Sequence, residues 1–259
     1  MPTALITGAS AGIGATFARA LACRQTDLVL VARSADKLQQ LAAQLKAQHQ
    51  IQVYVLAHDL TAPEAATAIH NTVMEKGLEI DLLINNAGFG DYGDFAERDG
   101  DRQIKMVQLN VLALVDLTHK FLPGMRQRRS GGIINLASTA AFQPIPYFAV
   151  YAASKAFVLT FSEALWAENR QYGVRILAVC PGPTETKFFQ EADFPPTFAK
   201  AASKNYTSPQ QVVKESLQAL DKNRSSIVPR FTNKISANAH RFLPRQALVS
   251  LIGNVFKQR

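Results

Sequence analysis

The sequence predicts an α/β fold, in which a parallel β-sheet is covered by helices on both faces. Four units of a short apolar run followed by a helical pattern lie between residues 3 and 125, and this alternation is typical of parallel sheets. A glycine-rich turn follows the first apolar run directly. The chain has 259 residues and is 47% hydrophobic, which suits a packed core and favours a single domain over residues 1–259.

The expected elements follow one another along the chain. Strands are predicted at residues 3–7, 27–33, 51–56, 80–84, 131–136, 174–180 and 226–229, about seven in all. Helices are predicted at residues 12–23, 35–48, 62–77, 104–125, 148–167 and 210–220, and residues 231–259 are expected to form a C-terminal helical extension. Residues 89–101 are rich in Gly and Asp and are expected to form a loop. Crossovers between the parallel strands should be right-handed.

The first strand leads into Gly8, Gly12 and Gly14 at the start of a helical pattern. Glycine lets a backbone approach a phosphate closely, and a helix N-terminus offers free N–H groups and partial positive charge. The spacing G-x-x-x-G-x-G differs from the dinucleotide fingerprint G-x-G-x-x-G. For this stretch alone, a turn that merely joins strand to helix is therefore the alternative.

The second strand ends at Arg33 and Ser34. In dinucleotide-binding folds an Asp or Glu at this point binds the ribose 2′-hydroxyl of NAD. A guanidinium and a hydroxyl instead suit a 2′-phosphate, because Arg forms strong charge-assisted bonds to phosphate. The sequence thus favours NADP(H) over NAD, the alternative being a surface Arg beside a helix N-cap at Ser34.

The helix predicted at residues 148–167 contains Tyr151 and Lys155. Residues four apart lie on one face of a helix. A nearby ammonium favours the phenolate and lowers the pKa of a tyrosine, so the pair would form an acid–base unit. A Y-x-x-x-K pair also occurs on ordinary amphipathic helices. Ser138, at the end of a predicted strand thirteen residues before Tyr151, favours the acid–base interpretation.

Together these features resemble the short-chain dehydrogenase/reductase family over residues 3–190. The family's glycine motif appears at residues 7–14, its adenine-side acid as Asp59-Leu60, its structural motif as Asn85-Asn86-Ala87-Gly88 and its proline–glycine motif at residues 181–186. Its catalytic tetrad falls on Asn110, Ser138, Tyr151 and Lys155. An Asn inside an apolar helix usually bonds a backbone carbonyl, and only the resemblance makes Asn110 a site residue. The resemblance implies a Rossmann-type, doubly wound sheet.

The resemblance also implies roles for these residues. Tyr151 would be the general acid for reduction and the base for oxidation. Lys155 would hold the nicotinamide ribose, Ser138 would donate a hydrogen bond to the substrate oxygen, and Asn110 would position a water that links Lys155 to solvent. NADP(H) would be bound by Gly8, Ser10, Gly12, Ile13, Gly14, Arg33, Ser34, Asp59, Leu60, Asn86, Ala87, Gly88, Tyr151, Lys155, Pro181, Gly182, Thr184 and Thr186.

The chain departs from the family pattern in two places. Many NADP-dependent relatives carry a basic residue where this chain has Ala11, so Arg33 would bind a 2′-phosphate without that help. From about residue 207 the chain has no common family motif. It is more weakly similar there to bacterial reductases of the ketoacyl and hydroxysteroid type.

Composition narrows the classes of partner. The net charge is +8, which suits nucleic acid, a membrane surface or an anionic ligand. The longest basic cluster, residues 126–129, has no interleaved aromatic residues and is interpreted as a solvated helix end, so no nucleic-acid partner is expected. Cys23 and Cys180 lack partners at metal-ligand spacing, so no metal is expected. No apolar run approaches the ~20 residues that cross a bilayer, and no signal-peptide pattern opens the chain. We therefore expect a cytoplasmic protein.

Three segments have apolar residues without an obvious partner. The helix at 148–167 is apolar nearly all round, which predicts a homodimer or homotetramer unless the C-terminal segment covers it. Residues 187–206 occupy the position of the family's mobile lid, and their aromatic residues suggest an apolar substrate, the alternative being rings that anchor the loop to its own core. In residues 244–259 the apolar stripe Leu248, Leu251, Ile252 and Val255 is expected to pack on protein or a partner subunit, with peripheral membrane contact or an acyl tunnel as alternatives.

The sequence therefore predicts an NADPH-dependent oxidoreductase that transfers a hydride between the nicotinamide and an apolar carbonyl or secondary alcohol. Ketoacyl, steroid-like and other ketone substrates all stay open, as does the physiological direction. The alternative is a catalytically silent NADP(H)-binding sensor or scaffold. A missing tetrad residue would favour that alternative, and none is missing.

Overall fold

The computed structural model describes residues 1–203, 206–239 and 244–257, and a parallel sheet forms its centre. The strands are β1 (Thr3–Thr7), β2 (Asp27–Ala32), β3 (Val53–Ala57), β4 (Leu82–Asn85), β5 (Gly131–Leu136), β6 (Val174–Val179) and β7 (Ser226–Ile227). They lie in the order β3-β2-β1-β4-β5-β6-β7, so the direction of winding reverses between β1 and β4. In open α/β sheets ligands bind outside the carboxyl ends of the strands at such a reversal.

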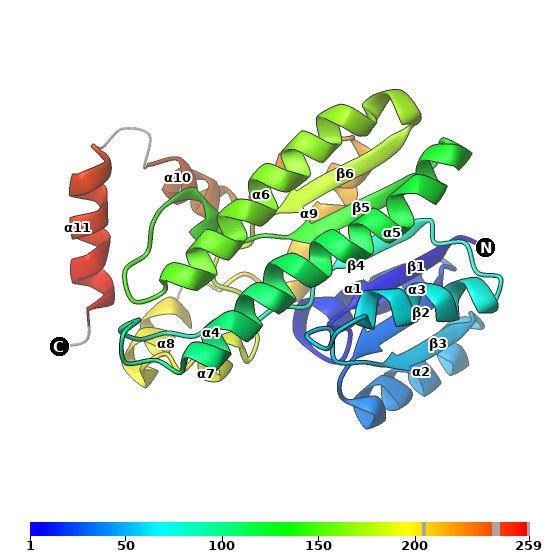
Figure 1. Ribbon diagram of the computed structural model, residues 1–259, viewed down its shortest axis with the longest axis horizontal. Helices are drawn as coiled ribbons and strands as arrows, with labels where there is room; N and C mark the ends of the chain where they lie inside the picture. The colour runs from blue at the N-terminus through cyan, green and yellow to red at the C-terminus, as the bar shows by residue number, and fades with distance from the viewer. Residues whose placement is uncertain (204–205, 240–243, 258–259) are drawn as a thin grey trace.

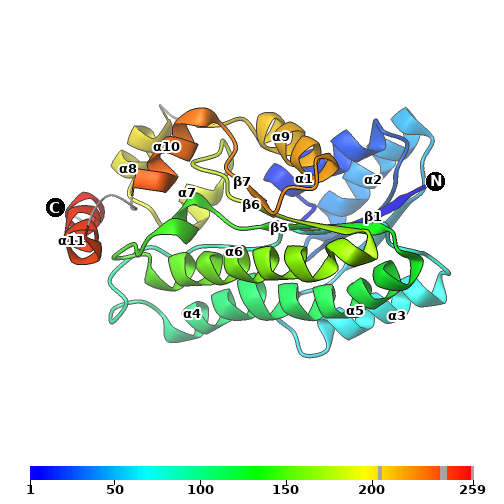
Figure 2. The same cartoon turned by 90° about the horizontal axis from the view of Figure 1, so that it is seen from above.

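Helices cover both faces of this sheet (Figure 2). One face carries α1 (Gly12–Ala22), α2 (Ala35–His49) and α9 (Pro209–Asp221), and the other carries α3 (Ala65–Glu75), α4 (Gly100–Val107), α5 (Ala113–Arg128) and α6 (Ala149–Asn169). Neighbouring side chains of β1 serve opposite faces: Ile6 belongs to the first core and Leu5 to the second. Strands that are buried on both faces need unbroken apolar runs. The apolar runs of the sequence therefore predicted the positions of these strands. The expected doubly wound, Rossmann-type fold is confirmed.

The helix expected at residues 104–125 is longer than predicted and is interrupted. It begins at Gly100, where the Asp99 side chain accepts a hydrogen bond from the Asp101 N–H, and α5 continues to Arg128. Between α4 and α5 one π-helical turn, η1 (Gln108–Leu112), contains Asn110. Such π turns occur inside otherwise α-helical segments. The apolar periodicity continues across the turn, so the sequence pattern does not reveal it.

The edge strand β7 has two residues instead of the four expected at residues 226–229. Ser226 pairs with Ala178, and Ile227 pairs with Val179 of β6. Pro229 follows two residues later. It has no N–H to extend the ladder, which explains the early end of the strand.

Short elements of the second half of the chain gather around one end of the sheet (Figure 1). They are η2 (Thr139–Phe142), α7 (Phe188–Glu191), α8 (Pro196–Ser203), α10 (Phe231–Ala239) and α11 (Arg245–Phe256), while η3 (Arg170–Tyr172) joins α6 to β6. Figure 1 shows α11 at the edge of the molecule. Residues 240–243 and 258–259 of the expected extension lie outside the described residues.

Only half of the apolar stripe on α11 is covered by protein. Leu248 and Ile252 are buried, whereas Leu251 is 58% and Val255 is 65% exposed. The packing expected for residues 244–259 therefore holds for one side of the helix. Across the described parts of the chain, no helix has both the length and the apolar character to cross a membrane.

Candidate active site

The backbone of the glycine turn after β1 has a conformation that residues with a side chain would not adopt. Gly8 and Gly12 have φ values of +65° and +54°, in the left-handed region that favours glycine. A Cβ on Gly14 would lie 2.3 Å from the Gly8 carbonyl oxygen. The turn thus brings the start of α1 directly against the end of β1.

Polar contacts from the loop after β4, the strand next to β1, brace this turn. The Thr7 hydroxyl accepts hydrogen bonds from the N–H groups of Asn86 (2.9 Å) and Ala87 (3.0 Å). The Asn86 amide donates to the carbonyl oxygens of Thr7 (2.9 Å) and Gly8 (3.2 Å). The structural motif predicted after the fourth strand therefore holds the glycine turn.

The N-terminus of α1 is open to an anion. The N-cap residue is Ala11, no side chain caps the helix, and its first turn contains no acidic residue. Unpaired N–H groups and the helix dipole favour a phosphate at such a point. Ser10 and Ile13 lie half-buried beside these groups, and the Thr186 methyl is 3.2 Å from the position of a Cβ on Gly12. The residues present fit the diphosphate of a dinucleotide.

The carboxyl ends of β2 and β3 carry the residues expected at the adenosine. Arg33 and Ser34 are exposed after β2, and Asp59 follows β3, which pairs with β2. The Asp59 carboxylate accepts hydrogen bonds from the Thr61 N–H (2.9 Å) and hydroxyl (2.8 Å). These bonds lower the pKa of Asp59, and the charge of Arg33 contributes. Leu60 is buried beside it, so the site combines a fixed carboxylate with an exposed guanidinium.

Tyr151 and Ser138 meet at the carboxyl end of β5. Ser138 caps η2, where its hydroxyl accepts a hydrogen bond from the Ala140 N–H at 3.1 Å. Tyr151, on the first turn of α6, is 8% exposed. Burial raises the pKa of Tyr151 to about 12, against an opposing effect of its hydrogen bond with Ser138. The phenol is therefore protonated at neutral pH.

Lys155 was expected to lower the pKa of Tyr151, and the structure does not show this effect. Its Nζ donates to the Leu136 carbonyl oxygen at 2.7 Å and lies 5.7 Å from the centre of the Tyr151 ring. Burial lowers the pKa of Lys155 to about 8, and the pKa of Tyr151 is raised. The expectation was wrong for this state of the protein, because it left out the cost of burying both groups.

Asn110 ties the loop after β4 to α6. Its amide donates to the Phe89 carbonyl oxygen (3.0 Å) and the Ser154 hydroxyl (3.1 Å), and its carbonyl accepts from the Phe89 N–H (3.1 Å). Ser154 in turn donates to the Tyr151 carbonyl oxygen at 2.7 Å. A Cβ on Gly88 would lie 2.8 Å from Asn110 Oδ1 and 3.4 Å from Lys155 Nζ. The π turn thus brings Asn110 beside Lys155, with its side chain fully engaged.

The proline–glycine motif lies between the glycine turn and the C-terminal elements. Pro181 is buried, and the Thr184 hydroxyl donates to the Gly182 carbonyl oxygen at 2.9 Å. Thr184 also forms a parallel β-bridge with Thr207. A Cβ on Gly182 would lie 2.6 Å from the Asn233 side chain, so α10 packs directly on the motif.

Aromatic rings close the space over Tyr151. The ring of Phe148 stacks on Tyr151 with 4.4 Å between centroids, and Phe188 lies at 5.3 Å. Phe148 and Phe188 both press on Gly90, where a Cβ would lie 2.6 Å from the first and 3.0 Å from the second. Phe188 belongs to residues 187–206, which we call the lid segment and of which residues 204–205 lie outside the described residues. The described part of the lid segment thus contributes a wall of the site.

A buried carboxylate that the sequence did not single out organises the loop before α4. Asp91 is 3% exposed, and it accepts hydrogen bonds from Arg98, Arg102 and Gln103. Burial alone would raise the pKa of Asp91, but the bonds from Arg98 and Arg102 outweigh burial and lower it. In the sequence Asp91 stands in a Gly- and Asp-rich stretch typical of a solvent-exposed loop, which gave no signal of burial.

The same two arginines reach the lid segment. Arg98 forms a 2.8 Å ion pair with Asp193, and Arg102 donates to the Glu191 carbonyl oxygen at 2.7 Å. The Tyr92 N–H donates to the Ala192 carbonyl oxygen at 2.9 Å. The loop at residues 89–99 and the lid segment are therefore joined in this closed arrangement.

Comparisons with known proteins agree with this site. A family model described as short chain dehydrogenase matches residues 2–196. The very-long-chain 3-oxoacyl-CoA reductase of Macaca fascicularis is 34% identical over 211 residues, which are 78% of this chain and 67% of that protein. A short-chain dehydrogenase from Sphingobium yanoikuyae, solved in complex with NADPH, is 34% identical, with a TM-score of 0.83 over 96% of each chain. The bulky-bulky ketone specific alcohol dehydrogenase from Comamonas testosteroni is 30% identical, with a TM-score of 0.78 over 96% of this chain and 94% of that one.

The family model covers the strands from β1 to β6 and every residue of the expected tetrad. The glycine turn, the braced loop after β4 and the Ser138–Tyr151 pair lie inside the matched region. The chain belongs to the short-chain dehydrogenase family.

Proposed function

We propose that this protein is an NADPH-dependent reductase of ketones that carry a long apolar substituent, with 3-oxoacyl thioesters as the favoured class. The observation that carries the proposal is the hydrogen bond between buried Tyr151 and half-buried Ser138, with Lys155 one helical turn away and aromatic rings against the phenol. A protonated phenol in a nearly dry site is suited to hand a proton to a carbonyl oxygen.

Each residue has a task in this chemistry. The hydroxyl of Tyr151 donates its proton to the carbonyl oxygen, and Ser138 donates a hydrogen bond that orients that oxygen. Lys155 holds the nicotinamide ribose, and Asn110 fixes the backbone around Gly88 beside it. A bound reduced nicotinamide supplies the hydride. The raised pKa of Tyr151 supports the direction of reduction, because the phenol keeps its proton at neutral pH.

Arg33 supports NADPH over NADH. It is exposed beside Ser34, where a 2′-phosphate would lie, and the acidic residue typical of NAD sites is absent from that position. The Sphingobium relative was solved with NADPH. The cofactor contacts expected along the glycine turn, Asp59 and residues 181–186 are part of the same proposal.

The aromatic wall supports an apolar substrate. Phe148 and Phe188 contact Tyr151 and exclude water from it. The Macaca relative is named for very-long-chain 3-oxoacyl-CoA and the Comamonas relative for bulky ketones. A ketone with a fatty chain on one side suits the apolar site and is consistent with the substrates for which both relatives are named.

A second copy of the chain is the proposed partner. Ile104 and Leu112 on the α4–α5 stretch and Phe157 on α6 are 60%, 58% and 43% exposed. α4 and α6 contact each other, so these residues share one outer layer (Figure 2). We propose a homodimer or homotetramer through this layer. The cytoplasmic location expected from the sequence stays a prediction.

The direct test is NADPH oxidation by the purified protein against ketones graded in chain length and shape, with Tyr151→Phe beside the wild type. We expect turnover with fatty 3-oxoacyl thioesters, a lower rate with NADH, and a loss of about 10²-fold or more in the variant. Because phenylalanine keeps the ring packing, NADPH binding should persist in the variant.

Two results would speak against the proposal. Equal turnover by Tyr151→Phe would remove the phenol from the chemistry. Tight NADPH binding without reduction of any ketone would bring the sensor or scaffold role forward.

A further inference from the structure

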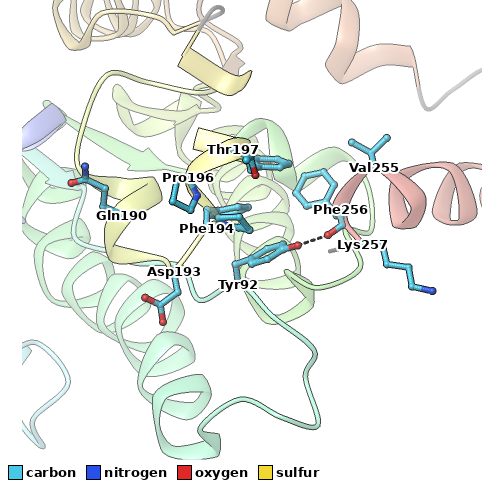
Figure 3. Close-up of a pocket in the computed structure, with 11 residues that line it drawn as sticks. Tyr92, Gln190, Asp193, Phe194, Pro196, Thr197, Val255, Phe256 and Lys257 are labelled. Atoms are coloured by element: carbon cyan, nitrogen blue, oxygen red, sulfur yellow. Dashed lines mark hydrogen bonds between the residues drawn. The ribbon is translucent and has the colours of Figure 1, made fainter. Parts of the chain in front are cut away.

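A groove lies between the lid segment and the last turn of α11 (Figure 3). Its volume is about 760 Å³, within the range of small-molecule sites. Tyr92, residues 190 and 193–198, and residues 255–257 line it. The groove therefore joins three parts of the chain that are far apart in sequence and lies outside the tetrad.

Stacked aromatic rings form part of the lining. Phe194 lies 4.5 Å from Tyr92 and 4.9 Å from Phe198, and Phe256 lies 5.0 Å from Phe198, between ring centroids. The Tyr92 hydroxyl donates to the Phe256 carbonyl oxygen, which holds the last turn of α11 against the rings (Figure 3). These rings form an apolar and well-anchored part of the lining, beside the polar side chains of Gln190, Asp193 and Lys257.

Ring contacts connect the lining of the groove to Tyr151. Phe194 contacts Phe148 at 5.0 Å, and Phe148 stacks on Tyr151 at 4.4 Å. All of these rings belong to one apolar cluster, in which Leu248 and Ile252 of α11 are also buried. Two rings therefore separate the groove from the phenol.

The wall on the α11 side presents an apolar side chain without a cover. Val255 lines the groove and is 65% exposed. Leu251, one turn earlier, is 58% exposed but does not line the groove. An apolar group that settled in the groove would cover Val255 and gain free energy by leaving water.

We infer that the groove binds the distal, fatty end of the acyl chain of the substrate. This inference rests on the proposed function and names a site for its chain-length preference. A chain that reaches the groove must part the rings of Phe148 and Phe194, which are in contact at 5.0 Å. A single polymethylene segment needs a smaller displacement of these rings than a fused ring system. The rings of the lid segment would turn aside as the chain passes.

The test uses 3-oxoacyl thioesters of N-acetylcysteamine with chains from about four to about sixteen carbons, in the NADPH oxidation assay on the full chain. Each methylene that reaches the groove should raise kcat/KM by up to about fourfold, equivalent to about 0.8 kcal/mol, until the groove is filled. In Val255→Glu, which places a charge in the groove wall, this rise should flatten, with the longest chains losing at least about tenfold.

Leu251→Glu is the matched control. It adds the same charge to the same helix, at an exposed position that does not line the groove. Its chain-length profile should match the wild type. The unfolding midpoint of both variants establishes that α11 is intact, and Val255→Thr, which keeps the side-chain shape, replaces Val255→Glu if the latter unfolds.

The outcomes separate this inference from the proposed function. Reduction of short thioesters without any rise along the series would overturn the groove assignment and leave the reductase in place. Equal flattening in Val255→Glu and Leu251→Glu would also overturn it. Reduction of no thioester at all would remove the proposed function itself, and the groove assignment with it.

Discussion

At the scale of single residues, burial shifts the pKa of both groups closest to the proposed chemistry toward the uncharged form. Burial raises the pKa of Tyr151 to about 12 and lowers the pKa of Lys155 to about 8. The Lys155 ammonium is satisfied by the Leu136 carbonyl oxygen rather than by the phenol. The closed protein therefore stores a proton on Tyr151, ready for donation.

The buried Lys155 should make the stability of the unliganded protein depend on pH. Below about pH 8 the amine is protonated in both the folded and unfolded states, so the folded protein bears the full cost of burying the charge. Between about 8 and 10.5 the unfolded chain still holds a proton that the folded protein has released. The contribution of Lys155 to the free energy of unfolding therefore rises with pH in this window, by up to roughly 1.4 kcal/mol per pH unit.

Lys155→Met removes this contribution. Urea unfolding at about pH 7 and about pH 9 should find the variant more stable than the wild type, with the advantage smaller by roughly 1 kcal/mol at the higher pH. Cys180, whose pKa burial raises to about 12, is present in both proteins, but its charge interaction with Lys155 is lost in the variant. A difference in stability that does not change with pH would contradict the low pKa of Lys155.

At the scale of elements, the buried carboxylate of Asp91 holds the lid segment indirectly, through two arginine side chains. Asp91 fixes Arg98 and Arg102, and these reach Asp193 and the Glu191 carbonyl oxygen. The pair of Arg98 with Asp193 is partly exposed, so it contributes up to about 1 kcal/mol and weakens with salt.

Asp193→Asn should loosen the lid segment without disturbing the buried Asp91. We expect KM for the ketone to rise by up to about fivefold with kcat nearly unchanged. The wild-type KM should rise with ionic strength toward that of the variant. Asp94→Asn is the control, because Asp94 accepts a hydrogen bond from Ala96 within its own loop. A KM that responds to both substitutions alike would argue against the ion pair.

The sequence predicted the parts of the site that short motifs encode. Tyr151 and Lys155 are fixed relative to each other by one helical turn, and Gly8, Gly12 and Gly14 occupy positions where a side chain would not fit. The π turn at Asn110 escaped prediction, because an apolar pattern does not change at one inserted residue. The burial of Asp91 escaped it too, because a Gly- and Asp-rich stretch does not show that Arg98 and Arg102 turn toward this carboxylate and also reach the lid segment.

At the scale of the whole molecule, the uncovered apolar side chains divide into two sets. Leu251 and Val255 lie on α11 at one end of the molecule (Figure 1). Ile104, Leu112 and Phe157 lie on the outer layer of α4, α5 and α6. From the sequence, packing of the C-terminal segment on the helix at residues 148–167 was the alternative to an oligomer. α11 packs on the lid segment, however, and Phe157 stays exposed within one chain.

Phe157→Glu should separate the copies of the chain. A charge in a closely packed apolar interface is costly, so we expect light scattering after size exclusion to report the mass of one 28.3 kDa chain where the wild type gives two or four. Leu251→Glu, which alters the other apolar set, should keep the wild-type mass. A variant mass identical to that of the wild type would place the interface elsewhere.

The side-chain amide of Asn86 donates hydrogen bonds to Thr7 and Gly8, which lie 79 and 78 positions earlier in the chain. The shape of the glycine turn therefore depends on contacts between distant parts of the sequence. β1 must pair with β4 before the glycine turn is braced, and closing such a long loop is slow compared with forming a helix. A nascent chain that has left the ribosome only as far as α3 carries the whole glycine motif without its shape. The ability to bind the phosphate of a nucleotide should therefore appear during synthesis in a single step, when β4 pairs with β1.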